Sequence, residues 1–216
     1  MTDHQNQWRH QLSEGLRVMA IDLSERRQQL LLDYLALLLK WNKAFNLTAI
    51  RDPGEMVPRQ LLDSLSILNL VQGERVLDVG TGPGLPGIPL AVAQPDRQFV
   101  LIDSNGKKTR FVQQAVVALG LDNVQVVRTR VEAYQPEAGF DTITSRAFAA
   151  LPRMVQLTRH LLADQGRLLA MKGTVPTDEI AELAAQGYRV EVAALSVPGS
   201  DGQRHALLVE QDCWTG

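Results

Sequence analysis

The chain has 216 residues, of which 45% are hydrophobic and 21% charged, with a formal net charge of −2. This suits one domain with an appended segment and excludes a collagen-like chain, a disordered chain or a generally basic nucleic-acid binder. Cys213 is the only cysteine, which excludes an intramolecular disulfide and, with no signal peptide at the start, favours a cytoplasmic location. No stretch approaches the roughly 18 apolar residues of a membrane span.

The first 72 residues have the pattern of helices and little strand character. Apolar residues recur at helical spacing from Trp8 to Met19, and Ser24 is a suitable N-cap for a long helix through about Phe45. A third helix is expected over about 55–70, with Pro58 tolerated only near its start. We expect residues 1–72 to form a helical segment that packs on a second domain, residues 73–216.

From residue 73 onward, short strands alternate with helices. We expect strands over 75–79, 99–103, 124–128, 142–145 and 168–172, and helices near 87–93, 107–119, 152–162 and 177–185. Two further strands, 188–197 and 205–211, flank a Pro-Gly-Ser-Asp-Gly turn that predicts a hairpin. The order predicts an α/β fold: a seven-stranded, mostly parallel sheet with a C-terminal antiparallel hairpin and an N-terminal helical extension.

The most informative stretch is a glycine-rich loop, residues 80–87, which follows a strand containing Asp78 and precedes a helix. Such glycines let the backbone approach a ligand closely. The loop lacks the Gly-Lys-Ser/Thr of a P-loop. Asp78 would repel a pyrophosphate, and Pro83 and Pro86 remove N–H donors that phosphates need. The loop therefore favours an adenosine ligand with a cationic centre, such as S-adenosylmethionine, with Asp78, Gly80 and Gly82 at its site.

Asp103 ends the second predicted strand, 21 residues after Gly82. In sheets of this kind, an acid about 20 residues after the glycine loop hydrogen bonds to ribose hydroxyls. We favour that role for Asp103. The alternative is that Asp103 caps the helix that begins near Lys107.

The basic residues are concentrated in two segments. Residues 96–130 carry a net charge of +3 and residues 142–172 a net charge of +4, which leaves −9 on the remainder. One reading is an ordinary solvated face; the other is a surface that meets phosphates. Under the second, Lys107, Lys108 and Arg110, at the start of a predicted helix, would contact phosphates.

The chain resembles a known family over nearly its whole length. The Asp78-x-Gly80-x-Gly82-x-Gly84 loop looks like motif I of class I (Rossmann-like) methyltransferases. Further strings resemble the RsmG (GidB) family of bacterial guanine-N7 methyltransferases of small-subunit (16S) ribosomal RNA. They are Lys-Trp-Asn-Lys at 40–43, Asn-Leu-Thr at 46–48, Leu-Asp-Ser at 62–64, Leu-Ile-Asp-Ser at 101–104, Ser-Arg-Ala at 145–147 and Met-Lys-Gly at 171–173.

The resemblance implies an S-adenosylmethionine site at Gly80, Leu85, Val131, Glu132 and Arg146. Leu85 would pack against the cofactor, and the Val131–Glu132 pair would lie near the adenine ring. Glu132 has an alternative role as an acid in the first turn of a helix. The implied substrate is 16S ribosomal RNA, within the small ribosomal subunit or an assembly intermediate. For such a substrate, Lys107, Lys108 and Arg110 would contact RNA phosphates, and Phe148 would stack on a base or pack in the core.

The residues limit the chemistry. Cys213 lies in the tail, which disfavours the cysteine-dependent methylation of pyrimidine carbon 5, and Ser145-Arg146-Ala147 does not match the motif of adenine amino-group methyltransferases. Guanine N7 attacks through a lone pair without losing a proton, so no general base is required. Gln60 stands where typical members of the family carry His, and Gln does not titrate. No metal-ligand spacing is present, so we expect no metal.

Arg146 is the candidate catalytic residue. Its guanidinium could fork onto guanine O6 or onto the cofactor's carboxylate; the alternative is a surface ion pair without a catalytic role. The sequence leaves two other classes open: a nicotinamide oxidoreductase, disfavoured by Asp78 and the two loop prolines, and a non-enzymatic assembly factor that retains the fold.

Overall fold

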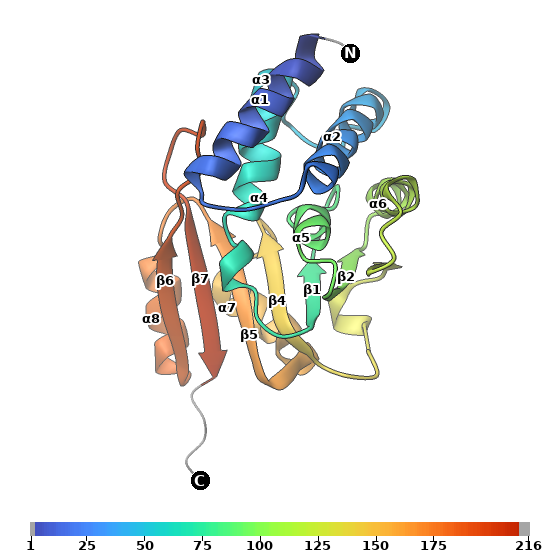
Figure 1. Ribbon diagram of the computed structural model, residues 1–216. Helices are drawn as coiled ribbons and strands as arrows, with labels where there is room; N and C mark the ends of the chain where they lie inside the picture. Colours follow the sequence, from blue (N-terminus) through green and yellow to red (C-terminus); the bar gives the residue numbers. More distant parts are fainter. Residues whose placement is uncertain (1–2, 212–216) are drawn as a thin grey trace.

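The computed structural model describes residues 3–211, so Cys213 lies outside the described part (Figure 1). Its centre is a seven-stranded sheet in the order β3-β2-β1-β4-β5-β7-β6. The strands are β1 (Arg75–Val79), β2 (Gln98–Asp103), β3 (Val124–Arg128), β4 (Phe140–Arg146), β5 (Leu162–Lys172), β6 (Tyr188–Ala194) and β7 (His205–Gln211). Strands β1 to β5 pair in parallel, and β7 runs antiparallel to both β5 and β6. The predicted sheet and its C-terminal hairpin are confirmed.

Helices cover both faces of the sheet (Figure 1). One face packs against α1 (Asp3–Val18), α2 (Glu25–Phe45), α5 (Gly87–Ala93) and α6 (Gly106–Leu119), and the other against α7 (Leu151–Thr158) and α8 (Thr177–Ala185). Two buried apolar clusters follow from the alternation of strand side chains: Val76 faces the first group, whereas Leu77 faces the second. None of the helices described in residues 3–211 has the length and apolar character to cross a membrane.

The N-terminal helices share a continuous core with the sheet. Trp8, Leu12 and Leu16 are buried in the same cluster as residues of β1, β2 and α5. Ser24 caps α2, as its sequence position predicts, because its hydroxyl accepts a hydrogen bond from the Arg27 N–H at 3.4 Å. The residues before β1 therefore cover one face of the sheet directly.

The third helix differs from its prediction. Instead of one helix over 55–70, the chain forms α3 (Pro53–Met56), a π-helix η1 (Val57–Leu62), α4 (Asp63–Leu65) and a 3₁₀ turn (Leu68–Leu70). Pro58 has no N–H to donate to the Gly54 carbonyl four residues earlier, and Gln11 Nε2 donates to that carbonyl instead, at 3.0 Å. The local hydrogen-bond ladder is thus replaced by tertiary contacts around Pro58.

Other boundaries shift by a few residues because of strand pairing. Phe140 pairs with Leu162, so β4 and β5 both begin earlier than predicted. For the same reason α7 ends at Thr158, and Arg159–Leu161 forms a 3₁₀ turn that leads into β5. Strand β6 ends at Ala194 rather than at Val197.

Candidate functional site

The glycine-rich loop turns sharply between β1 and α5, at the carboxyl edge of the parallel strands. Gly80 has φ +65°, in the left-handed region that disfavours side chains. A Cβ atom at Gly80 would also lie 2.6 Å from Phe148 Cδ2. Tyr34 of α2 supports the loop from outside, since its hydroxyl donates to the Pro83 carbonyl at 2.8 Å.

Asp78 holds the two ends of this loop together. Its Oδ2 accepts hydrogen bonds from Thr81 Oγ1 at 2.5 Å and from the Gly87 N–H at 2.9 Å, whereas its buried Oδ1 has no partner among the described residues. Burial raises the pKa of Asp78 to about 6, against the lowering effect of the bonds from Thr81 and Gly87. The structure thus places Asp78 beneath the loop, away from the cavity described next.

A cavity of about 350 Å³ opens above the ends of β1 to β4. Its walls are Val79 and Gly80 after β1, residues 102–104 after β2, residues 129–132 after β3, and Ala147 and Phe148 after β4, with Lys108 from α6. Four of the residues predicted to bind cofactor line it: Gly80, Asp103, Val131 and Glu132. Strand ends far apart in the sequence meet here because the strands are parallel and adjacent.

Asp103 joins the second strand to the glycine loop. Its Oδ2 accepts from the Gly82 N–H at 3.0 Å and its Oδ1 from the Asn105 N–H at 2.8 Å. The alternative role of Asp103 as the cap of α6 is wrong, since Asn105 occupies that position and accepts from the N–H groups of Lys107 and Lys108. Each carboxylate oxygen of Asp103 keeps a second lone pair for a ligand hydroxyl.

Of the other residues predicted to bind the cofactor, some lie at the cavity and some have side chains in the core. Glu132 is exposed at the cavity in a 3₁₀ turn, Val131–Ala133, while the Val131 side chain is 4% exposed and packs in the core. Leu85 is 2% exposed and belongs to the core beneath the N-terminal helices. Leu85 therefore does not line the cavity, because the turn of the loop directs it into the core.

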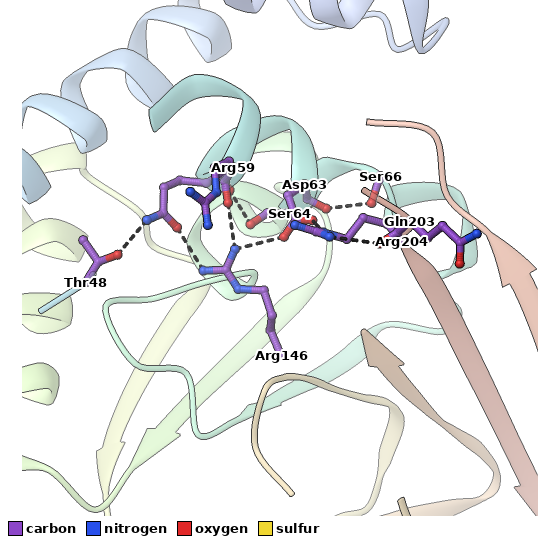
Figure 2. A network of polar contacts seen from close by, with 9 residues as sticks. Thr48, Arg59, Asp63, Ser64, Ser66, Arg146, Gln203 and Arg204 are labelled. Atoms are coloured by element: carbon purple, nitrogen blue, oxygen red, sulfur yellow. Dashed lines mark hydrogen bonds and ion pairs between the residues drawn. The ribbon is translucent and has the colours of Figure 1, made fainter. Parts of the chain in front are cut away.

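Arg146, at the end of β4, belongs to a polar network beside the loop (Figure 2). Its Nη1 donates to the Arg59 carbonyl at 3.1 Å and to Asp63 Oδ2 at 3.0 Å, and its Nη2 donates to Gln60 Oε1 at 3.0 Å. From the connection between β6 and β7, Arg204 Nε donates to Asp63 Oδ1 at 3.1 Å. Asp63, the first residue of α4, thus links the segment after the π-helix to the end of β4 and to the C-terminal hairpin.

Gln60 fixes the far side of the guanidinium. Its side chain is 1% exposed, and its Nε2 donates to Thr48 Oγ1 at 2.9 Å while its Oε1 accepts from Arg146. Because Nε2 donates to Thr48, the amide is oriented with Oε1 toward Arg146. Gln60 therefore offers the guanidinium a neutral acceptor. The sequence pattern had singled out Gln60 only as a group that does not titrate.

Sequence reasoning did not assign roles to Asp63 and Arg204. Asp63 lies in the Leu-Asp-Ser string, which was a usable signal, whereas Arg204 follows a hairpin turn and gave none. Of the three cations expected to contact RNA, Lys108 lines the cavity, and Lys107 and Arg110 are exposed on the same first turns of α6. Among residues 3–211, no group of His, Cys, Asp or Glu side chains is arranged to hold a metal ion.

The cavity suits a nucleoside with a zwitterionic tail. Asp103 and Glu132 are acceptors for hydroxyl or ammonium groups, Lys108 and Arg130 are partners for a carboxylate, and Phe148 supplies an apolar wall over Gly80. Its volume lies within the usual range of small-molecule sites. The residues present therefore fit S-adenosylmethionine.

Comparisons with known proteins point the same way. The family model GidB, described as rRNA small subunit methyltransferase G, matches residues 27–207. The ribosomal RNA small subunit methyltransferase G of Marinobacter nauticus is 57% identical over 204 residues, covering 94% of this chain and 95% of that protein. The protein of the same name from Chromobacterium violaceum is 57% identical over 199 residues, covering 91% and 95%.

Solved structures agree on the fold. The glycopeptide N-methyltransferase MtfA in complex with S-adenosylmethionine has a TM-score of 0.61 at 10% identity, covering 71% of this chain and 95% of that one. A SAM-dependent methyltransferase from Aquifex aeolicus has a TM-score of 0.56 at 20% identity, covering 73% and 93%. At such low identity these structures establish the class I methyltransferase architecture alone.

Proposed function

Since this chain belongs to the rRNA small subunit methyltransferase G (GidB) family, we propose that it transfers a methyl group from S-adenosylmethionine to N7 of a guanine in 16S ribosomal RNA. The observation that carries the proposal is the cavity at the ends of β1 to β4, in which Asp103 is tied to the glycine loop through the Gly82 N–H. The membership supplies the reaction class, and the cavity supplies a place for its cofactor.

The cofactor's contacts follow from the positions of the lining residues. When bound, S-adenosylmethionine supplies an electrophilic methyl group on a sulfonium. Asp103 would accept from the ribose hydroxyls and the Val131–Glu132 turn would face the adenine, while Gly80 lets the Phe148 ring lie directly over the loop as a wall of the cavity. Asp78, Gly82 and Leu85 act from beneath, by holding the loop in the shape that admits the cofactor.

The chain contributes to the reaction by positioning guanine N7 relative to the methyl group. Guanine N7 needs no deprotonation, which agrees with Gln60, a group that cannot accept a proton, at the network beside the loop. Alignment of N7 with the methyl group for in-line displacement can supply roughly 7–11 kcal/mol in the best cases. Residues around the cavity therefore act by orienting the base and excluding water.

Arg146 is the residue we assign to orienting the base. Its bonds to Asp63, Gln60 and the Arg59 carbonyl use three of its five N–H groups, so the anchored guanidinium retains donors for guanine O6 or the cofactor's carboxylate. The ion pair with Asp63 is only partly exposed, with 24% of the Arg146 side chain accessible. It therefore holds the fork in one orientation rather than leaving it mobile in solvent.

The substrate is 16S RNA in the cytoplasm, as part of the small subunit or an assembly intermediate. Lys107, Lys108 and Arg110 support this proposal, since all three lie in the first turns of α6, where Lys108 lines the cavity and the other two are exposed. Backbone phosphates would release counterions on binding there, so RNA affinity should fall steeply with salt.

Two measurements test the function. Calorimetry should show S-adenosylmethionine and its demethylated product binding in the micromolar range, about −8 kcal/mol, with no competition from NAD. Labelled methyl transfer to 16S RNA, followed by strand scission at 7-methylguanine, should locate one modified base. Binding of NAD in place of S-adenosylmethionine would indicate an oxidoreductase, and cofactor binding without transfer to any form of 16S RNA would indicate an assembly factor.

A further inference from the structure

We propose that the C-terminal end of α2 and the first turns of α6 form a docking surface for single-stranded ribosomal RNA, on which an unpaired base stacks against Phe45. This inference rests on the proposed function, because it extends the binding of the same RNA substrate. We call this region the α2–α6 surface; its members are Lys40, Lys43, Phe45, Lys107 and Arg110.

A row of aromatic rings connects the surface to the core. Phe111 of α6 is fully buried, and its ring centroid lies 5.7 Å from that of Trp41 on α2. Trp41 is half-buried and lies 5.2 Å from Phe45, whose side chain is 41% exposed. Each ring supports the next, so Phe45 presents a face that is held in place from behind.

Phe45 differs from the other exposed apolar side chains. Among the residues whose side chains are described, the large hydrophobic residues with comparable exposure are Val18, Val117 and Val192, which are aliphatic. An exposed aliphatic residue is ordinary on a protein surface and requires no explanation. A supported aromatic ring is what single-strand binders use as a platform, because every base has a π-face.

The two chain segments that contain these rings carry only positive charges. Residues 34–51 and residues 104–121, which include the three rings, each contain three Lys or Arg and no Asp or Glu. The rest of the chain therefore carries a net charge of −8. Two acid-free segments that meet through Trp41 and Phe111 form a positive surface on a molecule whose remaining net charge is negative, and polyanions are attracted to such a surface.

This surface is continuous with the cavity. Lys107 and Lys108 lie in the first turn of α6, whose N-terminus is fixed by the Asn105 cap. Lys108 lines the cavity, while Lys107 lies four residues before Phe111, one helical turn away on the side that meets α2. A strand of RNA whose target base reaches the cofactor at the mouth of the cavity would thus pass over α6 toward Phe45.

Single-stranded RNA is the partner that these features fit together. A duplex keeps its bases stacked and offers only phosphates, which leaves the ring of Phe45 unused. A protein partner would need an apolar patch, whereas Phe45 is a single exposed ring on a segment that carries only positive charges. Alternating base stacking and phosphate pairing uses both the ring and the cations.

The test is Phe45→Ala, measured with protein-free 16S RNA and with purified small subunits. Loss of one stacked base should weaken binding of protein-free RNA roughly 5- to 150-fold and raise KM for RNA, with kcat at saturating RNA and the Kd of S-adenosylmethionine unchanged. Phe45→Trp should restore binding, because it restores a π-face. Val192→Ala on β6, a residue 40% exposed, is the matched control and should leave RNA binding unchanged. Lys40→Ala with Lys43→Ala should lower the salt slope by about 1–2.

Three results would overturn the docking surface while leaving the proposed function intact. One is unchanged RNA affinity in Phe45→Ala when the unaltered chain methylates RNA. The second is a loss of affinity in Phe45→Trp as large as that in Phe45→Ala, which would mean that a π-face at this position does not bind a base. The third is loss of affinity for subunits but not for protein-free RNA, which would identify a ribosomal protein as the partner. Absence of methyl transfer by the unaltered chain would instead reject the proposed function itself.

Discussion

Substitution of Arg146 by Lys separates the shape of its guanidinium from its charge. In the structure Nη1 and Nη2 reach three acceptors on the π-helix segment: the Arg59 carbonyl, Asp63 Oδ2 and Gln60 Oε1. A lysine ammonium is a single point charge and cannot bridge acceptors on opposite sides of a planar fork. We expect Arg146→Lys to keep the ion pair with Asp63 and to lose the bonds to Gln60 and the Arg59 carbonyl.

The size of the effect follows from these contacts. A hydrogen bond to a charged group contributes about 1.5–3 kcal/mol, but 24% of the Arg146 side chain is accessible to water that can replace part of a lost bond. Arg146→Lys should therefore lower the free energy of unfolding by about 1–2 kcal/mol. Arg146→Ala should lower it by about 2–4 kcal/mol, less than the full cost of an unpaired buried charge, because Arg204 still neutralises Asp63.

The assay combines stability with catalysis. Urea unfolding gives the free energies, and a chain of this length should lose about 2–4 °C in Tm for each kcal/mol. Methyl transfer to 16S RNA should fall strongly in both variants, since the fork that orients the base is absent from each. The control is Arg59→Lys, whose exposed ion pair with Glu55 should change stability by no more than about 1 kcal/mol.

Two outcomes would refute this reasoning. Near-normal turnover in Arg146→Lys would reduce the role of the residue to simple charge. Near-normal turnover in Arg146→Ala, with the expected loss of stability, would make Arg146 a structural link between β4 and the π-helix and remove it from the reaction.

Further predictions concern the loop. Gly80→Ala should weaken S-adenosylmethionine binding at least tenfold in calorimetry, because its Cβ would displace the Phe148 ring that forms a wall of the cavity. Gly120→Ala, at φ +63° with no atom within 4 Å, should cost only backbone strain and leave binding intact. Equal losses in both variants would contradict this steric argument. Asp78 has a pKa of about 6 in the folded chain against its ordinary 3.8, so the folded state binds the proton more tightly and the contribution of Asp78 to stability falls as pH rises between those values. Urea unfolding at several pH values should accordingly show that the free energy of unfolding of Asp78→Asn, relative to that of the unaltered chain, increases by about 3 kcal/mol from pH 3.5 to pH 7. A difference that stays constant across that range would show that the pKa of the carboxyl is not perturbed.

The sequence by itself determined the sheet and the position of its loop. Alternating apolar strands and helices lead to parallel pairing, because each strand must be covered on both faces. The strand bounds of Arg75–Val79 and the helix bounds of Gly87–Ala93 agree with their predictions, since glycines and prolines in the loop between them stop one element and start the next. The ribose-binding role predicted for Asp103 required only its place at a strand end, and the structure puts it at the cavity.

Only the tertiary structure decided which polar groups meet beside that loop. Arg146 and Asp63 are separated by 83 residues and Arg204 and Asp63 by 141, so no local spacing could join them. Asp63 becomes their common partner because the fold brings the start of α4, directly after the π-helix, to the end of β4 and to Arg204, the residue before β7. Likewise, the sequence placed Asp78 at the cofactor, but burial and its bonds to Thr81 and Gly87 put it beneath the loop. Hydrogen-bond partners depend on three-dimensional distance, whereas secondary structure depends mainly on neighbours in the chain, and that difference separates what could be read from the sequence from what could not.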